Sequence, residues 1–353
     1  MSAAAHEPTE VSTAEDGAST FEEVAERYHD FTARITEQIR HRIVGQDDVV
    51  RDTVICLLCG GHLLLEGVPG LGKTELLKSL AESVQASFGR IQFTPDLMPA
   101  DVVGTEVVGA DDEGNRTFRY REGPIFTHLL LADEINRATP KTQSALLEAM
   151  QERQVTVAGE TRPLPDPFMV MATQNPIELE GTYPLPEAQL DRFLLKVLVP
   201  QPGPELLAHI LHRTTGARPE PVDAVCGPAQ LRWLTGITRQ VPVAPHLVSY
   251  AALLITATQP ESGNAPEVVQ RYVRAGSSPR GGQAMILAAK ARALLDGRPY
   301  VNGADLVVSA TSTLRHRVLL GYEATADGVT ADEIVAEVVS TVVEPGQDGR
   351  GIR

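Results

Sequence analysis

The sequence predicts an α/β fold, in which a parallel five-stranded sheet carries β-hairpin inserts and is followed by a smaller all-α domain. Three observations lead to this prediction. Short apolar runs alternate with segments of helical periodicity before residue 200. A glycine-rich loop separates the first of these runs from a helix. Beyond the proline-rich stretch 200–204, helical periodicity alone continues.

The chain divides into four segments. Residues 1–20 contain Ala, Ser, Thr and acidic residues but few large apolar side chains, which predicts disorder. Residues 21–202 are expected to form the α/β core, because the proline-rich break follows its last strand. Residues 203–343 form the helical domain, and the charged, glycine-rich segment 344–353 is expected to be a flexible tail.

Composition limits the class of protein and its partners. The chain has 353 residues and a formal net charge of −15, which disfavours general binding to the phosphate backbone of nucleic acids. We therefore expect protein partners and no nucleic acid. No apolar run reaches the roughly 18 residues of a membrane span, and the N-terminus lacks the features of a signal peptide. We expect no transmembrane segment and a cytoplasmic location. Cys56 and Cys59 lie in an apolar helical run, where cysteine acts as a small hydrophobic residue rather than a metal ligand.

Two helices are predicted before the first strand. Apolar residues recur every three or four positions from residue 21 to 42, and a turn at 43–46 ends this helix. A second helix spans residues 47–60. An apolar turn just before a nucleotide site often lines the base, so Val44 is expected to contact adenine, although the pair Ile43-Val44 could also be plain core.

A phosphate-binding loop follows the strand predicted at 62–66, and a helix at 75–85 comes after it. In such a P-loop, backbone N–H groups point inward, Lys73 reaches the β and γ phosphates, and the Thr74 hydroxyl takes one Mg²⁺ position. We therefore predict ATP and Mg²⁺ as cofactors. The residues expected to contact the nucleotide here are Gly67, Pro69, Gly70, Leu71, Gly72, Lys73, Thr74 and Glu75.

Polar residues follow two further strands at the edge of the sheet where such folds bind ligands. The strand at 128–134 ends in Asp133 and Glu134. Phosphoryl transfer needs one carboxylate in the Mg²⁺ shell and a second that activates water, and we assign these roles to Asp133, through a water molecule, and Glu134. Asn175, after the strand at 168–173, either positions the attacking water or forms a turn before proline.

The remaining elements complete the two domains. Two β-hairpins are predicted, at 104–121 and 154–164, the first a polar, turn-rich projection. The other core elements are a strand at 90–93, helices at 140–152 and 187–191, and a strand at 193–199. The helical domain is expected to contain helices at 206–212, 230–239, 246–258, 283–295 and 304–314.

Six blocks of sequence together resemble the MoxR-type AAA+ ATPases. They are residues 67–74, 131–138, 143–150, 172–176, 187–193 and 278–280. The resemblance extends from about Phe31 to Tyr322. It implies an AAA+ core followed by a helical lid, and an ATPase that acts as a hexameric ring.

The resemblance also implies roles for individual residues. Lys73 and Thr74 match the Walker A motif, and Asp133 and Glu134 match Walker B. Asn175 matches sensor 1, which favours its role at the attacking water.

Two arginines gain roles from the same resemblance. Arg280 matches sensor 2 on the lid, a nucleotide contact, and Arg192 matches the arginine finger that acts in trans on a neighbour's γ-phosphate. Arg137 is a rival candidate for the finger. Because Gly281 and Gly282 follow Arg280, we expect a frayed first helical turn that ATP orders.

The resemblance finally implies a chaperone-like remodeller that matures or activates a partner, either a protein with a von Willebrand factor A domain or a metalloenzyme. The hairpins would face the pore or this partner. One alternative is a nucleic-acid motor of a related insert-bearing clade, which the acidic charge disfavours. Another is a nucleotide-gated scaffold, which the complete set of catalytic residues disfavours.

Overall fold

The computed structural model describes residues 11–13, 16–110, 116–176, 181–216 and 221–345. Its centre is a parallel five-stranded sheet with the strand order β11-β3-β10-β7-β4, so the predicted fold class is confirmed. The strands are β3 (Leu63–Glu66), β4 (Phe88–Gln92), β7 (Leu129–Asp133), β10 (Met169–Gln174) and β11 (Leu195–Leu198).

Both faces of the sheet are buried, as expected for parallel strands joined by helices. In β3, Leu63 and Leu65 pack into one apolar cluster, whereas Leu64 packs into a second cluster on the other face. The first cluster continues into the helical domain, so the two domains share a core on that side. The core helices are α1 (Phe21–Arg40), α2 (Asp47–Leu58), α3 (Lys73–Ser83), α4 (Pro99–Val103), α5 (Pro140–Glu152) and α6 (Glu187–Leu190).

Capping residues explain where several helices begin. Thr20 and Glu23 form a capping box at the start of α1. Proline occupies the first turn of α5 and of four helices in the second domain, where its missing N–H has no helical partner to lose. The predicted bounds of α5, 140–152, are confirmed for this reason.

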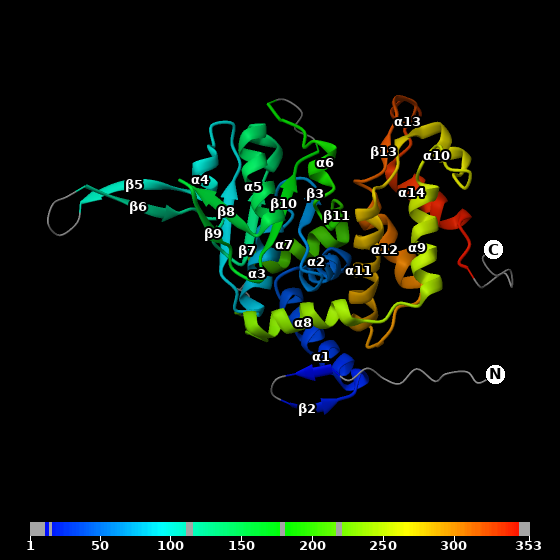
Figure 1. The fold of residues 1–353 in the computed structure, drawn as a ribbon, viewed down its shortest axis with the longest axis horizontal. Helices are drawn as coiled ribbons and strands as arrows, with labels where there is room; N and C mark the ends of the chain where they lie inside the picture. Colours follow the sequence, from blue (N-terminus) through cyan, green and yellow to red (C-terminus); the bar gives the residue numbers. More distant parts are fainter. Residues whose placement is uncertain (1–10, 14–15, 111–115, 177–180, 217–220, 346–353) are drawn as a thin grey trace.

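Antiparallel hairpins adjoin this body among the described residues, and one of them projects far from it (Figure 1). The strands β5 (Gly104–Ala110) and β6 (Arg116–Glu122) form the long projection, and β8 (Gln154–Val157) and β9 (Glu160–Pro163) the shorter one. Both were predicted. The third pairs β1 (Val11–Thr13) with β2 (Asp16–Ser19), within the segment predicted to be disordered. Backbone pairing of this kind needs no large apolar side chains, so composition alone did not indicate it.

The second domain contains more elements than the sequence predicted. Its five expected helices are present, but three further helices and a two-stranded ladder, β12 with β13, were missed. The helices are α7 (Pro204–Thr215), α8 (Pro228–Gln240), α9 (Pro245–Ala257), α10 (Glu267–Tyr272), α11 (Pro279–Leu295), α12 (Gly303–Leu314), α13 (Tyr322–Asp327) and α14 (Ala331–Thr341), and the strands are Val273–Ala275 and Leu319–Leu320. The predicted tail lies outside the described residues from residue 346 onward.

Among the described residues, no single helix has the length and apolar composition that crossing a membrane requires. The bent pair α8 and α9 meets those two criteria only when its helices are taken together.

Candidate active site

The phosphate-binding loop joins β3 to α3 in a conformation that depends on glycine. Gly70 and Gly72 have φ values of +84° and +78°, in the left-handed region that glycine adopts without strain. A Cβ on Gly67 would lie 3.0 Å from the Val199 carbonyl oxygen, so this position also requires a close backbone approach. Lys73 Nζ donates a hydrogen bond of 2.6 Å to the Gly67 carbonyl. Burial lowers the pKa of this half-buried ammonium group, although nearby carboxylates oppose the effect.

The two acids after β7 are held by a buried threonine from the next strand. Thr173 Oγ1 donates to Asp133 Oδ1 at 2.6 Å and accepts from the Glu134 N–H at 2.9 Å. Glu134 has a φ of +56°, a conformation that turns the chain sharply after the strand. Thr173 therefore fixes both acids relative to each other.

Residues of β4 contact the same acids, because β4 lies beside β7 and Gln92 is level with Asp133. Arg90 pairs with Asp133 at 2.7 Å, and Gln92 donates to Glu134 at 2.8 Å. The sequence analysis missed Arg90, Gln92 and Thr173. Alternation along 90–92 could have indicated the first two, but only after the strand order was known.

A cavity of about 390 Å³ collects the predicted phosphate and metal residues at the carboxyl ends of β3, β7 and β10. Thr74 and Asp133 both line it, and their oxygen atoms suit Mg²⁺, so the residues present fit the implied ion. The predicted residues on its wall are Pro69, Gly70, Gly72, Lys73, Thr74, Glu75, Asp133, Glu134 and Asn175.

A second, more apolar cavity of about 450 Å³ adjoins the loop and shares Gly70, Gly72 and Glu75 with the first. Val44 and Leu71 lie on its wall, and Leu207 and Ile210 of α7 line it as well. Val44 thus lies on an apolar cavity beside the loop, and its contact with adenine stays a prediction.

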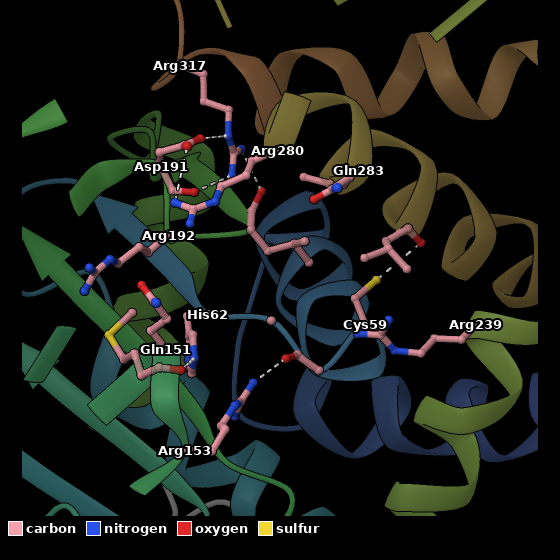
Figure 2. Close-up of a pocket in the computed structure, with 16 residues that line it drawn as sticks. Cys59, His62, Gln151, Arg153, Asp191, Arg192, Arg239, Arg280, Gln283 and Arg317 are labelled. Carbon is pink, nitrogen blue, oxygen red and sulfur yellow. Dashed lines mark hydrogen bonds and ion pairs between the residues drawn. The ribbon is translucent and has the colours of Figure 1, made fainter. Parts of the chain in front are cut away.

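A third cleft, of about 300 Å³, lies at the opposite edge of the sheet (Figure 2). It is lined by the residues just before β3 and β11, which are the amino ends of these strands. Among the described residues, its wall carries one acid, Asp191, and five arginines, which are Arg153, Arg192, Arg239, Arg280 and Arg317. In a chain of net charge −15, this cluster is a local concentration of positive charge.

The histidine in this cleft adds no charge to it. His62 Nε2 lies 3.1 Å from the Met150 carbonyl, and Nδ1 accepts from the Val170 N–H at 3.0 Å. Burial lowers the pKa of His62 to about 3, so the ring is neutral near pH 7.

Arg280 lines the third cleft, as Arg192 does, and not the phosphate cavity. Its expected contact with nucleotide stays a prediction. A motif shows that an arginine begins a lid helix, but it does not show which edge of the sheet that helix faces. Both candidate fingers are bonded within their own chain, Arg137 to Glu134 at 2.9 Å and Arg192 to the Leu147 carbonyl at 2.7 Å, so the choice between them stays a prediction.

The first turn of α11 is regular in the structure, whereas a frayed turn that ATP orders was expected after Arg280. Ser278 caps α11 by accepting from the Arg280 N–H at 3.2 Å. Gly281 is buried, and a Cβ there would lie 2.0 Å from Ser277 Oγ and 2.9 Å from Leu314. The first glycine is therefore needed for close packing of α11, rather than for flexibility.

The three cysteines are free and buried, as the sequence analysis expected of Cys56 and Cys59. In the described part of the chain, no group of three or more His, Cys, Asp or Glu side chains could hold a metal ion.

The strand, loop and helix with Lys73, the acids at the end of β7 in the same sheet and the appended helical lid define the class as a P-loop AAA+ ATPase. Sequence comparison agrees. A family described as "ATPase family associated with various cellular activities (AAA)" matches residues 62–195, and the AAA lid domain matches residues 266–338.

Similar individual proteins identify the family within this class. Chaperone MoxR1 of Mycobacterium tuberculosis is 44% identical over 87% of this chain and 81% of its own length. Protein YeaC of Bacillus subtilis is 43% identical over 91% of this chain and 97% of its own length. The crystal structure of a candidate ATPase from Cytophaga hutchinsonii superposes with a TM-score of 0.85 at 37% identity, covering 91% of this chain and 97% of that one. The chain belongs to the MoxR family of AAA+ ATPases.

Proposed function

We propose that this protein is a Mg²⁺-dependent ATPase whose subunits assemble head to tail into a hexameric ring and remodel a partner protein. The observation that carries the proposal is the placement of two complementary sites on opposite edges of one sheet. The phosphate residues lie at the carboxyl ends of the strands, and the arginine cleft lies at the amino ends.

In this proposal, the phosphate cavity binds and activates the nucleotide. Loop N–H groups and Lys73 hold the phosphates, while Thr74 and, through water, Asp133 hold Mg²⁺. When bound, Mg²⁺ neutralises charge on the β and γ phosphates. Glu134 accepts a proton from the attacking water, which Asn175 positions.

Side chains of the same chain contact both acids of the phosphate cavity. Arg90 pairs with Asp133, and Gln92 and Arg137 donate to Glu134. Asp133 and Glu134 line the phosphate cavity together with Arg90 and Gln92, so these two side chains lie beside the acids where the nucleotide is proposed to bind.

In the ring, the arginine cleft of one subunit supplies the cation that acts on the γ-phosphate bound by its neighbour. Sites on opposite edges cannot meet within one chain, but they meet when copies associate head to tail, and such contacts close into rings. Arg192 is the proposed finger, and Arg280 is reassigned to the same neighbouring nucleotide. An arginine supplied in trans is worth roughly 10³ to 10⁵ in rate in related phosphoryl transfer.

The partner is proposed to be a protein in the cytoplasm, either one with a von Willebrand factor A domain or a metalloenzyme. The name "Chaperone MoxR1" of a relative supports a chaperone-like role. The projecting hairpin offers a contact surface, since Val108 and Phe118 are opposite each other on its two strands and are exposed. We propose that this hairpin and the shorter one face the ring's pore or the partner.

Replacing Glu134 with Gln tests the function. The variant should bind ATP and assemble on adding it, but release phosphate at least about 100-fold more slowly, because the proton acceptor is lost. Phosphate release and particle mass, each with and without ATP, measure the two effects. Glu22→Gln, an exposed carboxylate on α1, is the matched control.

The other outcomes separate the alternatives. Unchanged hydrolysis in Glu134→Gln would disprove the role of this acid. A wild-type protein that assembles with ATP but does not turn it over would be a nucleotide-gated scaffold. Tight, salt-dependent binding to DNA would indicate a nucleic-acid motor instead.

A further inference from the structure

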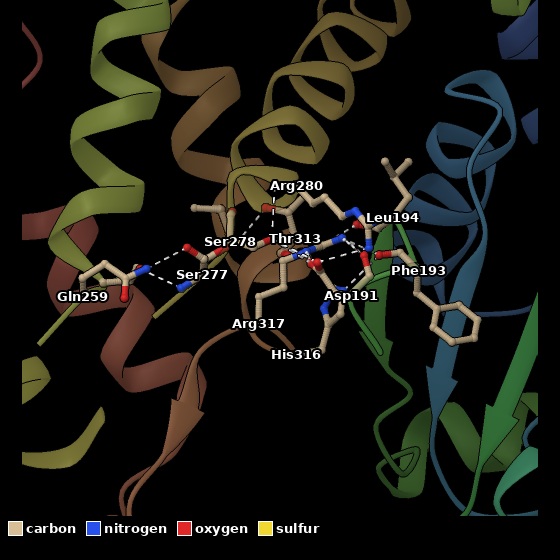
Figure 3. Close-up of polar contacts among 12 residues, drawn as sticks. Asp191, Phe193, Leu194, Gln259, Ser277, Ser278, Arg280, Thr313, His316 and Arg317 are labelled. Atoms are coloured by element: carbon tan, nitrogen blue, oxygen red, sulfur yellow. Dashed lines mark hydrogen bonds and ion pairs between the residues drawn. The ribbon is translucent and has the colours of Figure 1, made fainter. Parts of the chain in front are cut away.

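The segment that carries Arg192 is fixed by a buried arginine from the helical domain (Figure 3). Arg317, whose side chain is 3% exposed, follows α12. Its Nε donates to Asp191 Oδ1 at 2.8 Å, and its Nη2 donates to the carbonyls of Asp191 at 3.0 Å and Phe193 at 2.6 Å. Its Nη1 donates to the Leu194 carbonyl at 3.2 Å. One lid side chain therefore contacts the core on both sides of Arg192.

The Asp191 carboxylate receives two further donors from the start of α11. Ser278 Oγ lies 3.0 Å from Oδ2 and 3.2 Å from Oδ1. Arg280 Nη1 lies 3.5 Å from Oδ2, and the Arg280 side chain is 52% exposed whereas that of Asp191 is 19% exposed. The carboxylate thus joins one buried arginine and one arginine that is half open to the cleft.

The charges around Asp191 explain why this carboxylate can hold two arginines close together. In the described part of the chain, it is the one carboxylate on a cleft wall that carries five arginines. Arg280 and Arg317 share it, and each arginine would otherwise repel the other. The longer contact to Arg280 is the weaker of the two. Asp191 therefore keeps Arg280 on the cleft wall, with the arginine side chain half exposed to an incoming anion.

We propose that Asp191 is a positioning residue for hydrolysis in the neighbouring subunit. Its carboxylate, anchored by Arg317, holds Arg280 on the cleft wall that Arg192 also lines. Arg192 donates to the Leu147 carbonyl at 2.7 Å, and it exchanges this contact when the two arginines meet the neighbour's terminal phosphate. This inference rests on the proposed ring ATPase. Because Arg317 joins the lid to the segment of Arg192, the lid and the arginine pair move as one body. A subunit's lid therefore follows the nucleotide of its neighbour.

The first test is Asp191→Asn, which keeps the shape of the side chain and removes its charge. We expect kcat to fall about 10- to 100-fold, because small misplacements of catalytic groups have effects of this size. The affinity of the variant for ATP should stay within about twofold of wild type, since its own phosphate cavity is unaltered. Combining it with Arg280→Gln should lower kcat no further than the more damaging single change, because the two residues act as one unit.

The second test mixes subunits with complementary defects. In a ring formed from equal amounts of Asp191→Asn and Glu134→Gln chains, about a quarter of the interfaces pair an intact phosphate cavity with an intact arginine cleft. The mixture should therefore recover about a quarter of the wild-type rate, whereas each variant alone stays low. A mixture of Arg192→Ala with Glu134→Gln should recover in the same way and tests the ring itself.

Control variants and thermal melting distinguish a folding defect from a loss of positioning. Glu187→Gln removes another carboxylate that pairs with a lid arginine, Arg274, but does not line the cleft, and its kcat should match wild type. Thermal melting reports whether Asp191→Asn folds. If Asp191→Asn does not fold, Ser278→Ala tests the positioning role instead. This change removes the hydroxyl that donates to the Asp191 carboxylate. That variant should lower kcat about two- to fivefold. Its mixture with Glu134→Gln chains should run at roughly 30–38% of the wild-type rate, against roughly 10–25% if the defect lay in the chain's own cavity.

Two results would overturn the inference. One is recovery of the Arg192→Ala mixture without recovery of the Asp191→Asn mixture, which would place the defect in the chain's own cavity. The other is an Asp191→Asn effect that persists in full when Arg280 is already Gln. Failure of both mixtures would instead overturn the proposed ring.

Discussion

The two edges of the central sheet are built in different ways. At the carboxyl edge, the site comes from a continuous loop and from the ends of adjacent strands, so backbone geometry and Thr173 set its positions. At the amino edge, long arginine side chains converge from the core and from the lid, and Asp191 organises them. The first edge is determined by local sequence, whereas the second depends on how two domains pack.

The largest expected effect separates the roles of the two edges. Arg192→Ala should lower kcat roughly 10³-fold or more and leave nucleotide affinity unchanged, because its contact is made in the neighbour's site. Lys73→Ala should abolish binding, since it removes a phosphate contact within the chain. Titration with a fluorescent ATP analogue and phosphate release measure the two properties. Loss of binding in Arg192→Ala would show that the edges are not independent.

A smaller effect tests the organisation of the carboxyl edge. Thr173→Val removes the hydroxyl that joins Asp133 to the Glu134 backbone and keeps the shape of the side chain. Residues that orient metal-site groups cost about 10-fold or more in activity when lost, so kcat should fall by about that factor. Thr173→Ser keeps the hydroxyl and should restore most of the rate. Equal rates for Val and wild type would contradict the role of Thr173.

The smallest effect concerns the packing that holds the amino edge. Gly281→Ala should destabilise the fold by about 1–3 kcal/mol, because its Cβ would press on Ser277 and Leu314. At Gly282, the nearest atom to a Cβ is Ile255 Cγ1 at 3.3 Å, so Ala there should stay within about 1 kcal/mol of wild type. Chemical denaturation of both variants measures the difference. Equal stabilities would show that α11 packs less closely than described.

The same contrast explains which features the sequence could predict. The phosphate loop, the acids after β7 and the bounds of α5 follow from contiguous motifs and capping residues, and the structure brings them together as expected. Arg90 and Thr173 were missed because their contacts depend on strand order and register. The place of Arg280 on the arginine cleft was not predicted, because it depends on how the lid packs, which no local pattern encodes.

The separation of Arg192 from the phosphate cavity of its own chain has a genetic consequence. In the proposed ring, an allele that damages one edge leaves its product's other edge intact. When such an allele is expressed equally with the normal gene, about half of the interfaces stay competent, whichever edge is damaged. Under the same conditions, an allele that damages both edges leaves about a quarter of the interfaces competent. Two alleles with defects on different edges should complement each other within one gene.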